Sequence, residues 1–406
     1  MAKKGIIVIL VAFVIAGFAV TTLSEETADV GWMFPLTGAY GAYAEEMKRG
    51  VEMAVEEVNA QGGVLGKPIK VAIRDEELKA DVALRRAKEY LDSDIHIVGG
   101  NLSGGVSMVV NQWAQKNGVL YMSTCHNSLG QGADRTHFGF NSGVRSYSTG
   151  AALADYAFQN LGKKWMAITA DYRWGHDELA AFLVKSKEMG GECVGSIFVP
   201  LGTSDFSAYI PTIMAKKPDF VVLTVFGTDL VAAVKQFSEL GLTQKVKLVL
   251  PKTALPIMKE CGAAYDENIF GSVTWYWTLP NGKKFVDKYI QKYGRPPDAD
   301  ADSGYVGAWT LFKAMQLAGT KTDLEKIIAE LEKMQWNLNK GPESYRACDH
   351  VRMQKVVILQ GLGSKAKDWN LANVVAEVPA EKTLRTCEED AMDVPYGPIR
   401  EHLPGK

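Results

Sequence analysis

Residues 95–122 read IHIVGGNLSGGVSMVVNQWAQKNGVLYM and carry the strand–helix–strand pattern on which the fold prediction depends. Ile95–Val98 and Val119–Met122 are short apolar runs of strand length, and Val106–Lys116 between them has helical spacing. Two strands joined by a crossover helix are expected to be parallel neighbours in one sheet. The glycine-rich loop 99–105 lies where the first strand ends and the helix begins.

The same alternation of strand and helix extends in both directions from this stretch. Before it, strands are expected at 30–34 and 69–73, with helices at 45–59 and 81–91. After residue 145 the pattern begins again, with expected strands at 165–169, 193–199, 220–225 and 247–250 separated by helices. Two successive sets predict the α/β class, with two doubly wound parallel-sheet lobes.

Length and composition limit the class of protein. The chain has 406 residues, 47% of them hydrophobic, which is enough for two cores because single cores stop growing at about 250–300 residues. The formal net charge is -2, so the chain lacks the basic excess of a nucleic-acid-binding protein.

The N-terminus has the layout of a secretory signal peptide over residues 1–24. Lys3 and Lys4 precede the apolar run Ile6–Val20, and the acidic pair Glu25-Glu26 follows. The run is short for a membrane span, which needs about 20 residues. An uncleaved anchor is the alternative, and both interpretations predict a periplasmic or extracytoplasmic protein.

Five cysteines predict one disulfide. Cys348 and Cys387 both lie in the loop-rich C-terminal part and are the expected pair. An odd count leaves at least one thiol unpaired, and small buried side chains are expected for the three cysteines in or beside apolar segments, Cys125, Cys193 and Cys261. No Cys or His spacing of a zinc site occurs, so we expect neither a metal nor a cofactor.

Ligands of such sheets bind outside the carboxyl ends of the strands, so the loops there are the candidate site. In loop 99–105, Gly104 and Gly105 allow close approach of the backbone, and Ser103 adds a hydroxyl group. Unpaired N–H groups at the start of the following helix attract an anion, for which a carboxylate is the natural candidate. A phosphate loop would need a Gly-Lys-Ser/Thr or G-x-G-x-x-G pattern, which is absent, and a plain structural turn remains the alternative.

Other strand ends supply further candidates. Cys125, His126 and Asn127 follow the strand 119–122, where the Cys125 backbone and the Asn127 amide could bind a ligand. In the second lobe Trp174, Phe226 and Lys252 follow three different strands. Aromatic walls with few polar groups are typical of small-ligand clefts, although core positions for the aromatics and a surface position for Lys252 are the alternatives.

Signatures of catalysis are missing. The sequence contains no HExxH, no G-x-S-x-G and no Walker A motif. A hydrolase using His126 or His176 is the remaining enzyme hypothesis, but no Ser and Asp partners in a recognisable arrangement accompany either histidine.

Five segments give the chain a family resemblance. In order they are FPLTG (34–38), GVEMA (50–54), NAQGGVLG (59–66), DYRWG (171–175) and AWTL (308–311). Over about residues 28–360 the chain resembles periplasmic leucine/isoleucine/valine-binding proteins. The resemblance implies a monomer with the type I periplasmic-binding-protein fold, in which three hinge crossovers join the lobes. It also implies delivery of the ligand to the membrane permease of an ABC transporter. A ligand-sensing domain of the same fold that reports to a receptor is the alternative.

The resemblance also implies lobe boundaries. Lobe 1 is expected to comprise 28–145 and 277–341, and lobe 2 to comprise 146–276 and 342–362, with a C-terminal tail at 363–406.

Position by position, the resemblance assigns roles to the candidates. Ser103 and Gly105 match the loop that holds the ligand carboxylate, and Trp174 and Phe226 match aromatic positions of the second lobe. Lys252 matches an acidic position that pairs with the ammonium group of an amino acid. The departure favours an aromatic or aliphatic carboxylic acid without an α-amino group, while an amino acid stays open. The family's N-terminal disulfide is absent, because Glu77 and Leu102 stand near its positions.

Overall fold

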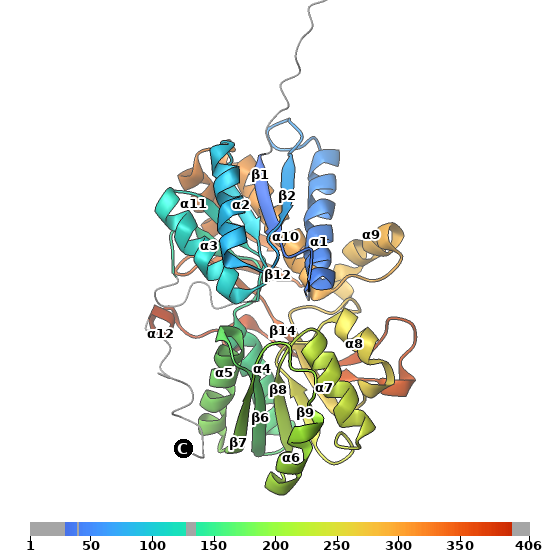
Figure 1. Cartoon of the computed structure of the whole chain (residues 1–406). Coiled ribbons are helices and arrows are strands. Elements are labelled where there is room, and N and C mark those ends of the chain that lie inside the picture. Colours follow the sequence, from blue (N-terminus) through green and yellow to red (C-terminus); the bar gives the residue numbers. More distant parts are fainter. Residues whose placement is uncertain (1–28, 39, 127–134, 392–406) are drawn as a thin grey trace, which may run out of the picture.

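Two α/β lobes lie one above the other in the computed structural model, which describes residues 29–38, 40–126 and 135–391 (Figure 1). Helices flank the sheet of each lobe. The predicted signal peptide 1–24 lies outside the described residues, as does Asn127. Within the described part, no helix is both long enough and apolar enough to cross a bilayer.

The first lobe is built on an eight-stranded sheet in the order β11-β12-β13-β5-β4-β3-β1-β2. The strands are β1 (Val30–Phe34), β2 (Val71–Asp75), β3 (Ile97–Gly100), β4 (Leu120–Ser123), β5 (Gly139–Asn141), β11 (Gln335–Asn337), β12 (Pro342–Arg346) and β13 (Val351–Met353). The helices are α1 (Gly41–Ala60), α2 (Ala80–Asp92), α3 (Gly104–Asn117), α9 (Lys283–Tyr293), α10 (Ala299–Ala318) and α11 (Leu324–Lys333).

The second lobe is built on a seven-stranded sheet in the order β15-β14-β10-β9-β8-β6-β7. Its strands are β6 (Lys164–Ala170), β7 (Glu192–Val199), β8 (Phe220–Thr224), β9 (Lys247–Leu250), β10 (Ile269–Val273), β14 (Val356–Gly361) and β15 (Ala372–Val378). Its helices are α4 (Ser146–Asn160), α5 (Arg173–Met189), α6 (Ile210–Lys216), α7 (Thr228–Glu239) and α8 (Leu255–Cys261), and a short helix α12 (Cys387–Ala391) follows β15.

The two lobes repeat one topology. In each, five parallel strands stand in the relative order 2-1-3-4-5, as β2-β1-β3-β4-β5 and as β7-β6-β8-β9-β10. This is the doubly wound arrangement, whose loops at the carboxyl ends of the strands are available for a ligand. The predicted pair of doubly wound lobes is confirmed.

Three crossings join the lobes, but the third lies later in the chain than predicted. The crossings run from β5 to α4, from β10 to α9 and from β13 to β14. The predicted start of the last lobe 2 segment at residue 342 is wrong, because β12 and β13 still pair within the first sheet. The predicted tail at 363–406 is also wrong in part, since β15 pairs with β14 at the edge of the second sheet.

Two glycines allow the backbones of α1 and α10 to approach each other closely. A Cβ atom on Gly50 would overlap the carbonyl oxygen of Ala301, and one on Gly304 would overlap that of Met47. Only glycine permits such an approach, which accounts physically for the glycine of the 50–54 segment. The contact positions the N-terminus of α10, where Asp300 pairs with Lys252 of the second lobe.

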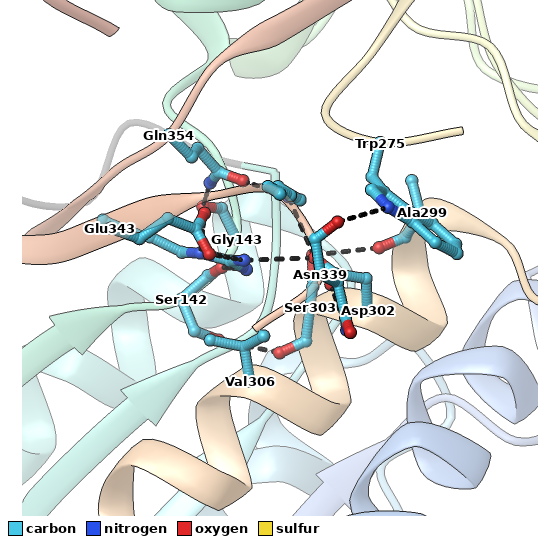
Figure 2. A network of polar contacts seen from close by, with 12 residues as sticks. Ser142, Gly143, Trp275, Ala299, Asp302, Ser303, Val306, Asn339, Glu343 and Gln354 are labelled. Atoms are coloured by element: carbon cyan, nitrogen blue, oxygen red, sulfur yellow. Dashed lines mark hydrogen bonds and ion pairs between the residues drawn. The ribbon is translucent and has the colours of Figure 1, made fainter. Parts of the chain in front are cut away.

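A buried ionic network lies where the three crossings meet (Figure 2). The Arg352 guanidinium lies beside Asp302 of α10 at 3.2 Å and Glu343 of β12 at 2.8 Å, and it donates to the Ser142 carbonyl oxygen at 3.2 Å. All three charged side chains are at most 5% exposed. Ser142 belongs to the first crossing, so the guanidinium joins it to β13, directly before the third.

Lys340 and Asn339 extend the network to the second crossing. The Lys340 ammonium lies 2.9 Å from an Asp302 carboxylate oxygen. The Asn339 side-chain amide donates to Asp302 at 2.9 Å, and the backbone carbonyl oxygen of Asn339 accepts from the indole N–H of Trp275 at 3.1 Å (Figure 2). Gln354 donates to the Gly143 carbonyl oxygen, which adds a link between the first and third crossings. One network therefore positions all three crossings.

Burial and charge act against each other in this network. Burial opposes ionisation of Asp302, but Lys340 and Arg352 outweigh it, so the pKa of Asp302 lies below its usual value. Burial, reinforced by repulsion from Arg352, lowers the pKa of Lys340 to about 8. Two cations and two carboxylates compensate each other, so removal of one leaves a buried charge without compensation.

A second buried carboxyl group lies just after β2. Glu76 is buried, and neither carboxyl oxygen has a hydrogen-bond partner within the described ranges. Burial raises its pKa to about 8. The adjacent residues Glu77 and Leu78 both have left-handed backbone conformations, with φ of 55° and 59°.

A disulfide joins Cys348 and Cys387, the pair expected from the sequence, with Cα atoms 6.2 Å apart. Cys348 lies in the turn between β12 and β13 of the first lobe, while Cys387 follows β15 of the second. Cys125 and Cys261 are free and buried, and Cys193 is free and half-buried.

We predict that Arg352→Met lowers the free energy of unfolding by about 3–5 kcal/mol, because Asp302 and Glu343 remain buried with Lys340 as their one remaining ion-pair partner among the described residues. Urea unfolding followed by circular dichroism measures the change. Arg86→Met is the matched control, since Arg86 pairs with the half-exposed Glu89 and such a pair contributes about 1 kcal/mol or less. Equal losses in the two variants would contradict a central role for Arg352.

We predict that Glu76→Gln gains stability relative to the native chain as pH rises. The folded-state pKa of Glu76 lies above its ordinary value of 4.5, so the stability linked to its protonation is present below pH 4.5 and lost as pH rises towards 8. Glutamine does not titrate, so the variant keeps its stability. Each pKa unit corresponds to about 1.4 kcal/mol, and a difference of a few kcal/mol is expected at pH 9. Urea unfolding at pH 5, 7 and 9 tests this, and a difference independent of pH would refute it.

Candidate ligand site between the lobes

Residues of both lobes line one pocket of about 310 Å³. The first lobe contributes Tyr40, Leu78, Leu102, Ser103, Gly104, Gly105 and His126. The second lobe contributes Tyr172, Arg173, Trp174, Leu201, Phe226 and Lys252. All of them follow the carboxyl ends of parallel strands, which is where the fold leaves space for a ligand.

The glycine-rich loop delivers backbone N–H groups to the pocket. Gly100 has φ +106°, and a Cβ atom there would overlap Met33; Asn101 follows with φ +66°. This left-handed turn leads into Ser103, whose extended backbone precedes α3 and whose hydroxyl makes no capping hydrogen bond. The first N–H groups of a helix have no intrahelical acceptor and carry partial positive charge. The loop is therefore suited to binding an anion.

Open space lies directly beside this loop. The nearest atom to a Cβ placed on Gly105 is the Ser103 hydroxyl oxygen, at 3.9 Å. Gly105 therefore leaves room for a ligand group to reach the backbone.

An aromatic cluster from both lobes forms the middle of the pocket. The Phe226 ring lies 5.0 Å from Tyr43, 5.9 Å from Tyr40 and 6.2 Å from Trp174, measured between ring centroids. The hydroxyl oxygens of Tyr40 and Tyr172 lie 3.5 Å apart across the lobes. Trp174 is 6% exposed and Phe226 is 7% exposed, so both are mainly buried yet present a face to the pocket.

Lys252 lines the pocket as half of an ion pair between the lobes. Its ammonium nitrogen lies 3.2 Å from Asp300 of α10 and 4.9 Å from the centroid of the Phe226 ring. Burial opposes its charge, but the nearby Asp300 outweighs burial and raises the pKa of Lys252. The cation that Lys252 brings to the pocket is therefore compensated by a carboxylate of the other lobe.

His126 reaches from the first lobe to two polar groups of the second. Its Nε2 atom lies 2.7 Å from the Thr149 hydroxyl of α4 and 2.9 Å from the Glu178 carboxyl group of α5. Burial, together with Lys252, lowers the pKa of His126 well below its usual value. Burial likewise raises the pKa of Glu178 well above the ordinary range.

The geometry around His126 differs from that of a catalytic relay. A relay needs the hydroxyl group on one imidazole nitrogen and the carboxylate on the other. Here both approach the same atom, Nε2, and the Thr149 hydroxyl is buried. His176 contacts Asp171 at 2.9 Å and is not among the residues that line the pocket.

Most sequence candidates come together in this pocket. Ser103, Gly104, Gly105, His126, Trp174, Phe226 and Lys252 all line it. Cys125 does not, because its buried thiol donates to the Leu102 carbonyl oxygen at 2.7 Å. Asn127 lies outside the described residues.

Six lining residues were not predicted. They are Tyr40, Leu78, Leu102, Tyr172, Arg173 and Leu201. Each follows or lies near the carboxyl end of a strand, where ligands of such sheets bind. Considering every loop at these strand ends would therefore have identified most of them.

Comparisons with known proteins agree with this geometry. A family model described as a periplasmic binding protein matches residues 27–367. A Leu/Ile/Val-binding protein of Rhizobium johnstonii is 24% identical over 332 residues, which span 80% of this chain and 88% of the relative. A Leu/Ile/Val-binding protein homologue of Brucella suis is 27% identical over 343 residues, covering 77% of this chain and 82% of the relative.

Solved structures share the fold. A periplasmic binding protein of Burkholderia mallei superposes with a TM-score of 0.82 at 24% identity, covering 90% of this chain and 98% of the other. A solute-binding protein of an ABC transporter from Rhodopseudomonas palustris, in complex with 3,4-dihydroxybenzoic acid, has a TM-score of 0.79 at 24% identity, with 86% and 97% covered. Another from R. palustris, in complex with benzoate, has a TM-score of 0.77 at 20% identity, with 86% and 96% covered.

The family match spans most of the chain, and the two lobes, the three crossings and the interlobe pocket accord with it. The chain belongs to the periplasmic binding protein family.

Proposed function

We propose that this protein is the extracytoplasmic solute-binding component of an ABC importer of the branched-chain amino acid type, and that its ligand is a small carboxylate without an ammonium group. One observation carries the choice of ligand. Among the described residues that line the pocket, two are cationic, Arg173 and Lys252, and none is acidic.

An ammonium group would be costly in this pocket. A buried charge needs a compensating charge or several hydrogen bonds, and leaving it without them costs several kcal/mol. The carboxyl groups that contact lining residues are already engaged, Asp300 by Lys252, Asp177 by Arg173 and Glu178 by His126. A carboxylate, in contrast, finds the first N–H groups of α3, the Ser103 hydroxyl and the ammonium group of Lys252.

The ion pair changes how Lys252 would contribute. Because Asp300 compensates its charge, a long-range electrostatic attraction for an anion is weak. An ammonium group has three N–H donors, and Asp300 accepts from one of them at 3.2 Å. Lys252 therefore acts at short range, as a hydrogen-bond donor with a fixed direction.

The aromatic cluster favours a ring in the ligand. Tyr40, Trp174 and Phe226 offer ring faces and edges, against which another ring packs well. The benzoate and 3,4-dihydroxybenzoic acid in the R. palustris structures support this class of ligand. We propose capture without chemistry, because the His126 contacts lack the geometry of a relay.

Isothermal titration calorimetry of the mature protein against benzoate, phenylacetate, leucine and phenylalanine tests the proposed ligand class. We expect the two acids without an ammonium group to bind at least about 10-fold more tightly than the amino acids, because an uncompensated ammonium costs more than 1.4 kcal/mol. Tighter binding of leucine or phenylalanine would contradict the proposal.

We predict that Lys252→Glu weakens benzoate binding by at least about 10-fold. The variant removes a donor and places a second carboxylate beside Asp300 and the bound anion, which repels both. Lys259→Glu is the matched control, because it makes the same charge change at an exposed residue of α8 that does not line the pocket. Calorimetry measures both affinities, and unchanged binding in Lys252→Glu would remove this lysine from the site.

A further inference from the structure

The lining residues of the first lobe follow the order of its strands. His126 follows β4, Ser103 follows β3, Tyr40 follows β1 and Leu78 follows β2. In the sheet these strands stand side by side as β4-β3-β1-β2. The chain leaves for the other lobe next to β4, from β5, whereas β2 is the edge farthest from that crossing. The order therefore runs from the hinge side of the pocket to its outer side.

The second lobe repeats this order. Lys252 follows β9, Phe226 follows β8, Trp174 lies beyond β6 and Leu201 follows β7. The strands stand side by side as β9-β8-β6-β7, with β9 beside the crossing strand β10 and β7 at the opposite edge. Leu78 and Leu201 thus hold equivalent positions in the two lobes, at the outer side of the pocket.

The pocket changes in chemistry along this direction. Polar His126 and Lys252 lie on the hinge side, the middle holds the aromatic residues together with Leu102, Ser103 and Arg173, and aliphatic Leu78 and Leu201 lie on the outer side. A ligand that matches this order has its polar end inside and an apolar end outside.

Leu201 is an unusual lining residue because it is 56% exposed. A single exposed leucine on a protein surface is ordinary and needs no explanation. This one, however, shares a pocket with Leu78, Leu102 and an aromatic cluster. An apolar ligand group at the outer end would cover it and gain the free energy of burying apolar surface.

Backbone strain marks the loop that presents Leu78. Glu77 and Leu78 are consecutive left-handed residues, and neither is glycine. That conformation is unfavourable for residues with a Cβ atom, and it persists only where the surroundings impose it. Here Asp75 accepts a hydrogen bond from the Glu77 N–H at 2.9 Å. Strain of this kind gathers at binding sites, and at this one its effect is to bring Leu78 to the pocket.

The volume of the pocket exceeds the needs of a single ring. An apolar cavity of roughly 150 Å³ holds benzene. The pocket measures about 310 Å³, about twice that volume. A carboxylate group fills only part of the difference.

We propose that the ligand is an aromatic carboxylate with an apolar extension, and that Leu78 and Leu201 determine specificity by packing on either side of that extension. This inference rests on the proposed function, since it names the class of carboxylate that the same pocket holds. In this proposal the two outer leucines discriminate between ligands by their length, and the inner residues bind the carboxylate.

Calorimetry with benzoate, 4-ethylbenzoate and 4-butylbenzoate tests the proposal. In the native chain we expect affinity to rise by about fourfold for each methylene group that the leucines cover. In Leu201→Ala and in Leu78→Ala we expect the gain from the alkyl chain, measured relative to benzoate in the same variant, to fall by at least half. Leu201 is more than half exposed, so its variant tests the proposal without a risk to folding.

Matched leucines elsewhere serve as controls. Leu65→Ala removes another left-handed leucine, with φ of 55°, and Leu240→Ala removes another exposed one, at 58%. Neither lines the pocket, and both variants should keep the full alkyl gain. If benzoate binds but the native chain shows no alkyl gain, or if Leu201→Ala keeps it, the inference is wrong and the proposed function stands. If none of the carboxylates binds, the proposed function itself is wrong.

Discussion

The guanidinium group of Arg352 is the constraint on which the two-lobed arrangement depends. It lies among Asp302, Glu343 and the Ser142 carbonyl oxygen, at the point where the chain passes between the lobes. A buried ion network costs desolvation energy that an apolar core would not, so its presence calls for a reason beyond stability. Arg352, Asp302 and Glu343 all belong to the first lobe. The second lobe can therefore rotate about the crossings without breaking their charges apart, and we interpret the network as a fixed base for the hinge.

Contacts of a different kind join the faces of the lobes. Lys252 with Asp300, His126 with Glu178, and Tyr40 with Tyr172 each pair one residue from either lobe. Opening of the cleft would separate these pairs and expose groups that are buried when they meet. A ligand adds its own contacts to the same closed arrangement, and it shifts the balance only by the difference in its affinity for the two states. In a hinge motion about the crossings, the network would fix where the lobes bend, and the interlobe pairs would limit how far they close.

The sequence predicted the local pattern well and the long-range pairings poorly, for physical reasons. Apolar runs and glycine-rich turns predict where strands end and loops begin. The loop at Ser103 and the aromatic residues Trp174 and Phe226 follow such strand ends, so they could be identified as site candidates. Strand order cannot be read from a single chain, so the shared position of Leu78 and Leu201 was invisible. Asp300 lies 48 residues from Lys252, and no local pattern announces their pairing. The short strands β12 and β13 were misplaced because antiparallel pairs with few apolar residues resemble irregular chain.

Charge balance links the lysine of this pocket to the chemistry of its ligand. The family resemblance implies an acidic residue at position 252 and an amino-acid ligand, whose own two charges cancel. That combination places one net negative charge between the lobes. Here Lys252 and Asp300 cancel each other, and a carboxylate ligand again brings one net negative charge. In the proposed complex the protein would supply, as Lys252, the cation that a carboxylate ligand without an ammonium group lacks. Both arrangements thus leave the same net charge in the cleft, which the N–H groups at the start of α3 are placed to stabilise. On the proposed function, the identity of residue 252 and the class of ligand are two aspects of one electrostatic constraint.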